Sequence, residues 1–145
     1  MPDTPRWRRR DLVRWPHLVM RGTWELLRAR LRTVRLQPTD LPELNRAAQA
    51  RGASADASGT SEVDRICFVI AVLARYLPWR SDCLPQALAG QNWLLARGIA
   101  SVIQVGAERT ASGDFGAHAW LVHNDRVVLG GDIDRFTPLV GGAGR

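Results

Sequence analysis

Apolar residues recur at intervals of three and four in the first third of the chain. The recurring positions within 23–36 are Trp24, Leu27, Leu31 and Val34. Arginines fill several of the positions between them, so the pattern predicts an amphipathic helix. The helical pattern extends over 11–36 as a whole, with interruptions expected at Pro16 and Gly22 because both residue types disfavour a helix interior.

Two more helices and a linker follow in the pattern. A short helix is expected at roughly 41–51, ending at Gly52. The stretch 52–61 consists of small and polar residues, which is typical of a linker or loop. The run 61–77 is apolar on most of its faces, with acids in its first turn and Arg75 near its end, and this predicts a buried helix.

The second half of the chain changes from helices to strands. A helix is predicted at roughly 83–97, with Ser81 or Asp82 as its cap. A strand is expected at 100–107, and the residues around the Asn-Asp pair in 117–130 form a hairpin pattern. Helices followed by strands predict an α+β fold in which the helix at 83–97 packs on a small antiparallel sheet. The remainder of the chain is interpreted as a turn-rich tail.

The length of 145 residues and the apolar fraction of 46% suit one main domain. We divide the chain into a basic helical segment with its linker at 1–60, a core at 61–139 and a flexible tail at 140–145. The formal charge of +6 is uneven, since the first 35 residues hold ten Arg against three acids, which gives +7, and the rest sums to −1.

An Arg-rich amphipathic helix is typical of proteins that touch a membrane surface or an acidic partner. The commonest alternative is a solvated helix face that packs on its own domain. Nucleic acid is not expected as a partner, because no nucleic-acid-binding motif accompanies the arginines.

The cysteine content points to a reducing compartment. Two cysteines 16 residues apart are too few for a disulfide framework and lack the spacing of a metal site. No signal peptide and no apolar run of membrane-spanning length are visible. We therefore expect a cytoplasmic protein with two free thiols and with neither a metal nor a cofactor.

Cys83 is the candidate nucleophile, because it stands at the start of a predicted helix. The N–H groups at a helix N-terminus and a neighbouring imidazolium both favour the thiolate form of cysteine. The same N–H groups point at any oxyanion that forms beside the sulfur, and Gln86 is a candidate side-chain helper. Cys67 lies in an apolar run and is interpreted as an inert core thiol.

Three histidines are candidates for the base that such a thiol needs. His17 lies in the basic segment, and His123 lies at the hairpin tip, where we expect it to be wet. His118 lies on a strand between two alanines, and alternation places its ring on the same face as Trp120. The small neighbours leave the His118 ring accessible to another layer, so we take His118 as the base.

A third group is expected to hold the imidazole in the correct tautomer. Asp132 and Asp134 follow the second hairpin strand and are both within reach of such a role. Asp125 lies at the turn and is less well placed. The residues alone leave the choice open between Asp132 and Asp134.

The motifs "CLP" at 83–85, "AHAW" at 117–120 and "DRFTPL" at 134–139 occur together in this chain. Their combination resembles the transglutaminase-like, papain-related cysteine protease superfamily and, more narrowly, the leader peptidases of lasso-peptide biosynthesis. The resemblance implies a Cys–His–Asp triad in which Cys83 is the nucleophile and His118 the base. It implies an acid shortly after the hairpin, and we take Asp132 with Asp134 in reserve, because "LGGD" is longer than the usual connection.

The resemblance implies an endopeptidase that removes the leader from a ribosomally made precursor peptide. A macrolactam synthetase would then cyclise the released core. Residues 1–60 show no series of strands that would form a fused recognition domain, so leader recognition is expected from a separate protein. Two alternatives remain: an acyl-transfer enzyme, such as a transglutaminase, with the same triad, and a non-enzymatic binding module that uses the basic segment.

Overall fold

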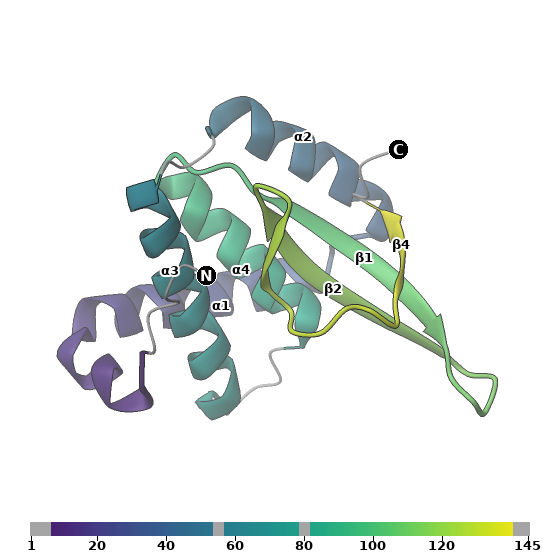
Figure 1. Cartoon of the computed structure of the whole chain (residues 1–145), viewed down its shortest axis with the longest axis horizontal. Coiled ribbons are helices and arrows are strands. Elements are labelled where there is room, and N and C mark those ends of the chain that lie inside the picture. The colour runs from purple at the N-terminus through teal and green to yellow at the C-terminus, as the bar shows by residue number, and fades with distance from the viewer. Residues whose placement is uncertain (1–6, 54–56, 79–81, 141–145) are drawn as a thin grey trace.

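The computed structural model describes residues 7–53, 57–78 and 82–140. In this part of the chain all the α-helices precede the strands, which confirms the predicted α+β fold (Figure 1). The helical elements are η1 (Arg9–Arg14), α1 (Pro16–Thr33), η2 (Pro38–Asp40), α2 (Leu41–Arg51), α3 (Ala57–Tyr76) and α4 (Cys83–Ala96). The strands are β1 (Val102–Arg109), β2 (Phe115–His123), β3 (Arg126–Leu129) and β4 (Thr137–Val140).

The two interruptions expected in the first helix have different outcomes. Pro16 is the first residue of α1, where its missing N–H costs no intrahelical hydrogen bond. Gly22 lies inside α1 without breaking it. A Cβ at Gly22 would lie 2.7 Å from Leu73 and 3.1 Å from Val69, so this glycine allows α1 to approach α3 closely.

The four strands form one antiparallel sheet in the order β3-β2-β1-β4. The turn between β2 and β3 places Asn124 and Asp125 at φ values of 48° and 60°, as a tight hairpin turn requires. The interpretation of the last residues as a turn-rich tail is wrong for 137–140, because β4 pairs with β1 there. Pro138 is tolerated because β4 is an edge strand.

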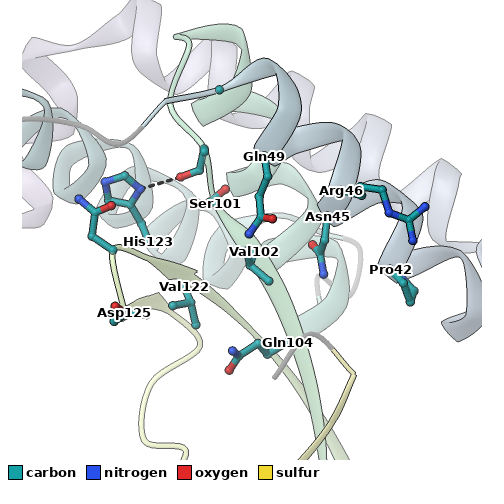
Figure 2. A pocket seen from close by; sticks show the side chains of 13 residues that line it. Pro42, Asn45, Arg46, Gln49, Ser101, Val102, Gln104, Val122, His123 and Asp125 are labelled. Carbon is teal, nitrogen blue, oxygen red and sulfur yellow. Dashed lines mark hydrogen bonds between the residues drawn. The ribbon is translucent and has the colours of Figure 1, made fainter. Parts of the chain in front are cut away.

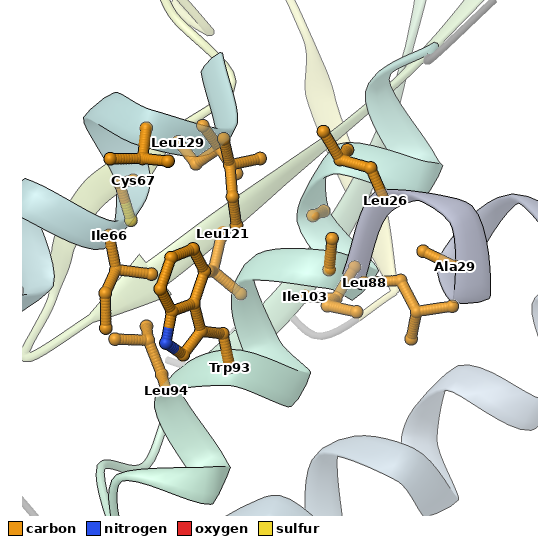
Figure 3. Packing of buried hydrophobic residues seen from close by; sticks show 14 of the residues in the cluster. Leu26, Ala29, Ile66, Cys67, Leu88, Trp93, Leu94, Ile103, Leu121 and Leu129 are labelled. Carbon is orange, nitrogen blue, oxygen red and sulfur yellow. The ribbon is translucent and has the colours of Figure 1, made fainter. Parts of the chain in front are cut away.

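Helix α4 lies at the centre of the core, between the other long helices and the sheet (Figure 1). Figure 3 shows Trp93 and Leu94 of α4 among side chains from α3 and the sheet, including Ile66, Leu121 and Leu129. From the other side, Leu26 of α1 is fully buried in the same cluster. Burial of this helix on several faces fixes where its first residue, Cys83, stands relative to the sheet.

Helices α1 and α2 both contribute fully buried side chains to this core. The division of the chain at residue 60 stays a prediction. The expectation of a linker at 52–61 is wrong for 57–61, because these residues form the first turn of α3. Residues 54–56 of the expected linker and 141–145 of the expected tail lie outside the described residues.

The side chain of Asn45 joins α2 to the sheet, because it makes the two hydrogen bonds to β1 that a neighbouring strand would otherwise make. Its Nδ2 donates to the Ile103 carbonyl oxygen at 2.8 Å, and the Ile103 N–H donates to Asn45 Oδ1 at 2.8 Å. Gln91 of α4 donates to Asn45 Oδ1 at 2.9 Å and to the Ser101 carbonyl oxygen at 3.1 Å. A buried amide pair therefore satisfies the backbone of β1 where β4 does not extend.

We expect Asn45→Ala to destabilise the protein by about 3 kcal/mol, because each buried polar group left without a partner costs about 1–3 kcal/mol. Thermal denaturation should show a fall in Tm of roughly 10 °C for a chain of this size. Gln49→Ala is the matched control, because Gln49 lies one turn further along α2 and is exposed. Equal Tm values for the two variants would show that the Asn45 hydrogen bonds contribute nothing net.

Candidate active site

Cys83 is the first residue of α4 and is partly buried. The preceding residue, Asp82, has extended backbone (φ −63°, ψ 177°), and its side chain makes no capping hydrogen bond to the helix. The first N–H groups of α4 therefore have no cap from the Asp82 side chain, and Ser81, the other expected cap, lies outside the described residues. N–H groups at the start of a helix can stabilise an oxyanion that develops beside the Cys83 sulfur.

A cleft of about 810 Å³ opens beside this helix end, between α3, α4 and the sheet. Cys83 and Gln86 line it from α4, His118 from β2, and Gly130 from the segment that follows β3. The structure thus brings the expected nucleophile, the candidate helper and the strand segment that carries the expected base to one cleft. The His118 ring lies on the sheet face of Trp120 and Phe136, whereas Ala119 and Leu121 of β2 face the helical core. Arg75 of α3 adds a positive charge to the lining of the cleft.

The His118 ring is held by a backbone carbonyl. Its Nε2 lies 2.6 Å from the Gly130 carbonyl oxygen. A carbonyl oxygen can only accept, so Nε2 carries the proton in this bond. In the neutral ring Nδ1 is then the unprotonated nitrogen, which is the form that a general base needs.

Aromatic contacts fix the ring plane. His118 stacks on Phe136 with a centroid distance of 4.9 Å and an interplanar angle of 28°. Trp120 lies on the same face of β2 at 6.1 Å from the His118 centroid, as the alternation predicts. The Trp120 Nε1 donates to Gln104 Oε1 at 2.7 Å, so the fully buried indole has its partner.

The expected acids lie near the cleft without a hydrogen bond to His118 among the described residues. Asp132 is exposed, and its Oδ1 accepts from the Asp134 N–H at 3.0 Å within the turn after β3. Asp134 is also exposed, and Asp125 lies at the hairpin turn, away from this cleft. Whether Asp132 or Asp134 completes a triad stays a prediction.

Gly130 and Phe136 are the groups at this site that the sequence did not reveal. Phe136 lies within the "DRFTPL" motif, which was the available signal for it. Gly130 acts through its backbone carbonyl, so its side chain gives no signal. The pair of glycines after the hairpin was the only sequence feature that marked this position.

The remaining histidines lie elsewhere. His17 is exposed on α1. His123 is 3% exposed, so the expectation of a wet position is wrong. Its Nδ1 donates to the Ala100 carbonyl oxygen at 2.6 Å, while its Nε2 has no partner among the described residues.

His123 lines a second cleft, of about 740 Å³, between α2 and the ends of β1 and β2 (Figure 2). Arg46 and Gln49 form its α2 side, and Val102 and Val122 belong to the strands opposite. Neither cysteine lines this cleft. The second cleft is therefore separate from the candidate active site.

Cys67 of α3 is 3% exposed, and both cysteines are free. Burial, with a smaller contribution from the charge of Asp64, raises the pKa of the Cys67 thiol to about 12. Cys67 is therefore protonated at neutral pH, which agrees with its interpretation as a core thiol.

The described residues contain no cluster of three His, Cys, Asp or Glu side chains that would hold a metal ion. None of the helices in the described part of the chain combines the length and the apolarity that a membrane crossing needs.

A thiol at a helix N-terminus, in a cleft that is also lined by a histidine-bearing strand, is typical of cysteine proteases and thioester-forming acyltransferases. A family model described as the transglutaminase-like superfamily matches residues 23–141, and the chain belongs to this superfamily. Its members are usually cysteine-based enzymes, so membership indicates cysteine protease or acyltransferase chemistry. Neither a search of curated proteins nor a search of solved structures found a match.

Proposed function

We propose that this protein is a cysteine endopeptidase that removes the leader from a ribosomally synthesised, lasso-type precursor peptide. The observation that carries the peptidase part is the shared cleft of Cys83 and His118, with the His118 Nε2 held by Gly130. The choice of a lasso-type precursor rests on the resemblance of the "CLP" and "AHAW" motifs.

The first half of the proposed reaction forms a thioester. The His118 Nδ1 takes the thiol proton, and the Cys83 sulfur attacks the scissile carbonyl carbon. The N–H groups at the start of α4 stabilise the oxyanion, with Gln86 as the side-chain helper. Collapse of this intermediate breaks the C–N bond, and His118 gives its proton to the leaving amine, which is the new N-terminus of the core.

The second half hydrolyses the thioester. A water molecule loses a proton to the His118 Nδ1 and attacks the thioester carbonyl carbon. The thiolate leaves, takes up the proton from His118, and the leader departs with a free carboxylate. In this scheme the hydrogen bond from Nε2 to Gly130 keeps the same nitrogen of His118 facing the reaction in both halves.

The proposal includes three partners: the precursor peptide, a separate leader-recognition protein and a macrolactam synthetase that acts on the released core. A newly exposed N-terminal amine is the nucleophile that macrolactam formation requires. A peptidase step therefore has to precede cyclisation. The place of action that we propose is the cytoplasm, where the Cys83 thiol stays reduced.

The test is to incubate a lasso-type precursor with the protein and the recognition protein from the same organism, and to weigh the products by mass spectrometry. Hydrolysis gives two fragments whose masses sum to the precursor plus one water. The alternative acyl-transfer reaction, run with an added primary amine, joins the amine to the acyl group. An amine adduct that forms without any hydrolysis product would show that the protein is an acyltransferase and not a peptidase.

Asp132 is expected to act on His118 through the turn after β3, because its Oδ1 accepts from the Asp134 N–H in the segment between Gly130 and Phe136. Asp132→Ala should lower kcat/KM by about tenfold, the equivalent of one lost hydrogen bond. Asp132→Asn should stay close to wild type, because an amide oxygen accepts the same bond. Cleavage rates of the two variants, with Tm measured alongside, decide the question.

Equal loss in Asp132→Asn and Asp132→Ala would show that the carboxylate charge is needed, as in a direct Cys–His–Asp triad. Asp134→Asn is the control, because only the backbone N–H of Asp134 takes part in the turn bond. A severe effect of Asp134→Asn would move the acid to that residue.

A further inference from the structure

Helix α1 carries a second apolar face that points away from the core. Its buried residues are Gly22, Glu25, Leu26 and Ala29. On the opposite side four large apolar side chains are more than half exposed: Met20 (74%), Trp24 (56%) and Leu31 (64%) of α1, and Val34 (78%), the residue directly after its last turn. With the partly buried Leu27, these five residues form what we call the outer seam.

The outer seam has the spacing of a helix-pairing surface. Its positions follow one another at intervals of four, three, four and three residues, from 20 to 34. This is the heptad pattern in which an apolar stripe of one helix meets that of another. Trp24 is the second residue of the stripe, and tryptophan is among the residues that contribute most to protein interfaces.

Arginines line one side of the outer seam. Arg21, Arg28 and Arg35 each follow a seam residue by one position, which is where charged residues flank a pairing seam. Arg21 and Arg28 contact Glu25 at 2.8 Å and 3.9 Å and still remain 44% and 48% exposed. A row of like charges disfavours pairing with a second copy of the same helix and favours an acidic partner.

The end of the outer seam is hollowed. A depression of about 670 Å³ lies beside Leu31 and Val34, and its lining also includes Leu36, two arginines, Arg32 and Arg35, and one acid, Asp40. Such a hollow receives a protruding side chain of a protein partner, which a bilayer surface does not supply. No residue of the outer seam lines the cleft of Cys83, so a partner bound here leaves the cleft open.

We infer that the outer seam binds an acidic amphipathic helix of a partner protein. This inference does not depend on the proposed peptidase activity. The expected partner helix has apolar residues at heptad spacing, with Glu or Asp beside them. The test must distinguish this helix from two other occupants of the outer seam: a membrane surface and a second copy of this chain.

The probe is a fluorescein-labelled synthetic peptide with Leu at the seam positions of each heptad and Glu at the flanking positions. The full-length protein is titrated into it, and anisotropy gives Kd. Leu31→Glu should weaken binding by at least about tenfold, since it places a charge in the contact and beside the Glu row. Ala50→Glu is the matched control, because Ala50 is exposed on α2 and the added charge is the same.

Four further measurements complete the test. A probe with Lys in place of Glu should bind at least about tenfold more weakly, and raising the salt to about 1 M should weaken the acidic probe. Equal binding of both probes, or equal binding by wild type and Leu31→Glu, would overturn the inference. Two other results would also overturn it when the wild type does not bind the acidic peptide. One is co-sedimentation with phosphatidylglycerol vesicles that Leu31→Glu abolishes. The other is a dimer in analytical ultracentrifugation that Leu31→Glu abolishes.

Discussion

Cys83→Ala should reduce precursor cleavage by at least about a thousandfold, because loss of the nucleophile leaves only binding and oxyanion stabilisation. The fold should be retained, since the side chain is only partly buried at the first position of α4. The measurement is the single-turnover rate of leader release with excess enzyme, with Tm as the check on folding. Leader release at the wild-type rate would rule out the proposed mechanism.

Cys67→Ala is the matched control for that experiment. It removes the other thiol of the chain, which is buried in the core and lines a different cleft from that of Cys83. Cleavage should stay near wild type, with a modest loss of stability from the small cavity. Iodoacetamide at neutral pH should inactivate the wild type by modifying Cys83, while Cys67 stays unmodified because its pKa is raised to about 12. Modification of Cys67 in the folded protein would contradict its burial.

The elements around the thiol were predictable because each has a local signal. Both ends of α4 are marked in the sequence. A cap position and a proline in the first turn mark its start, and a glycine after the last turn marks its end. The β2–β3 hairpin follows from an Asn-Asp pair between two alternating runs. With both elements known, Cys83 and His118 were the only thiol and imidazole that the topology was expected to bring together.

The parts that were missed depend on contacts between segments that are distant in sequence. His123 has the sequence context of an exposed hairpin tip, but its ring is buried and bonded to Ala100, before β1. Strand β4 is short and contains Pro138, so its pairing with β1 leaves no alternating pattern. The partner of the His118 Nε2 is a main-chain carbonyl, which any residue type supplies, so the sequence carried no mark of it.

Gly130→Ala should lower kcat by about 100-fold, because it shifts the carbonyl that orients His118, and a displacement of about 1 Å in a catalytic group has effects of that size. Gly130 has a φ of 120°, which L residues rarely adopt. A Cβ there would overlap the Cβ of Trp120 and lie 2.9 Å from its Cα, on the same face as His118. Strain and overlap together should also reduce stability by about 3–5 kcal/mol.

Gly131→Ala separates the effect on His118 from that of backbone strain alone. Gly131 also has a positive φ, 73°, but a Cβ there meets no described atom within 4 Å. This variant should lose about 1–2 kcal/mol of stability from its left-handed backbone and keep most of its activity. The decisive readout is the pH dependence of kcat/KM, because a displaced imidazole changes the shape of that profile, whereas a destabilised but correctly folded enzyme keeps it. Identical profiles and equal losses of kcat for the two variants would show that the Gly130 carbonyl does not orient the base.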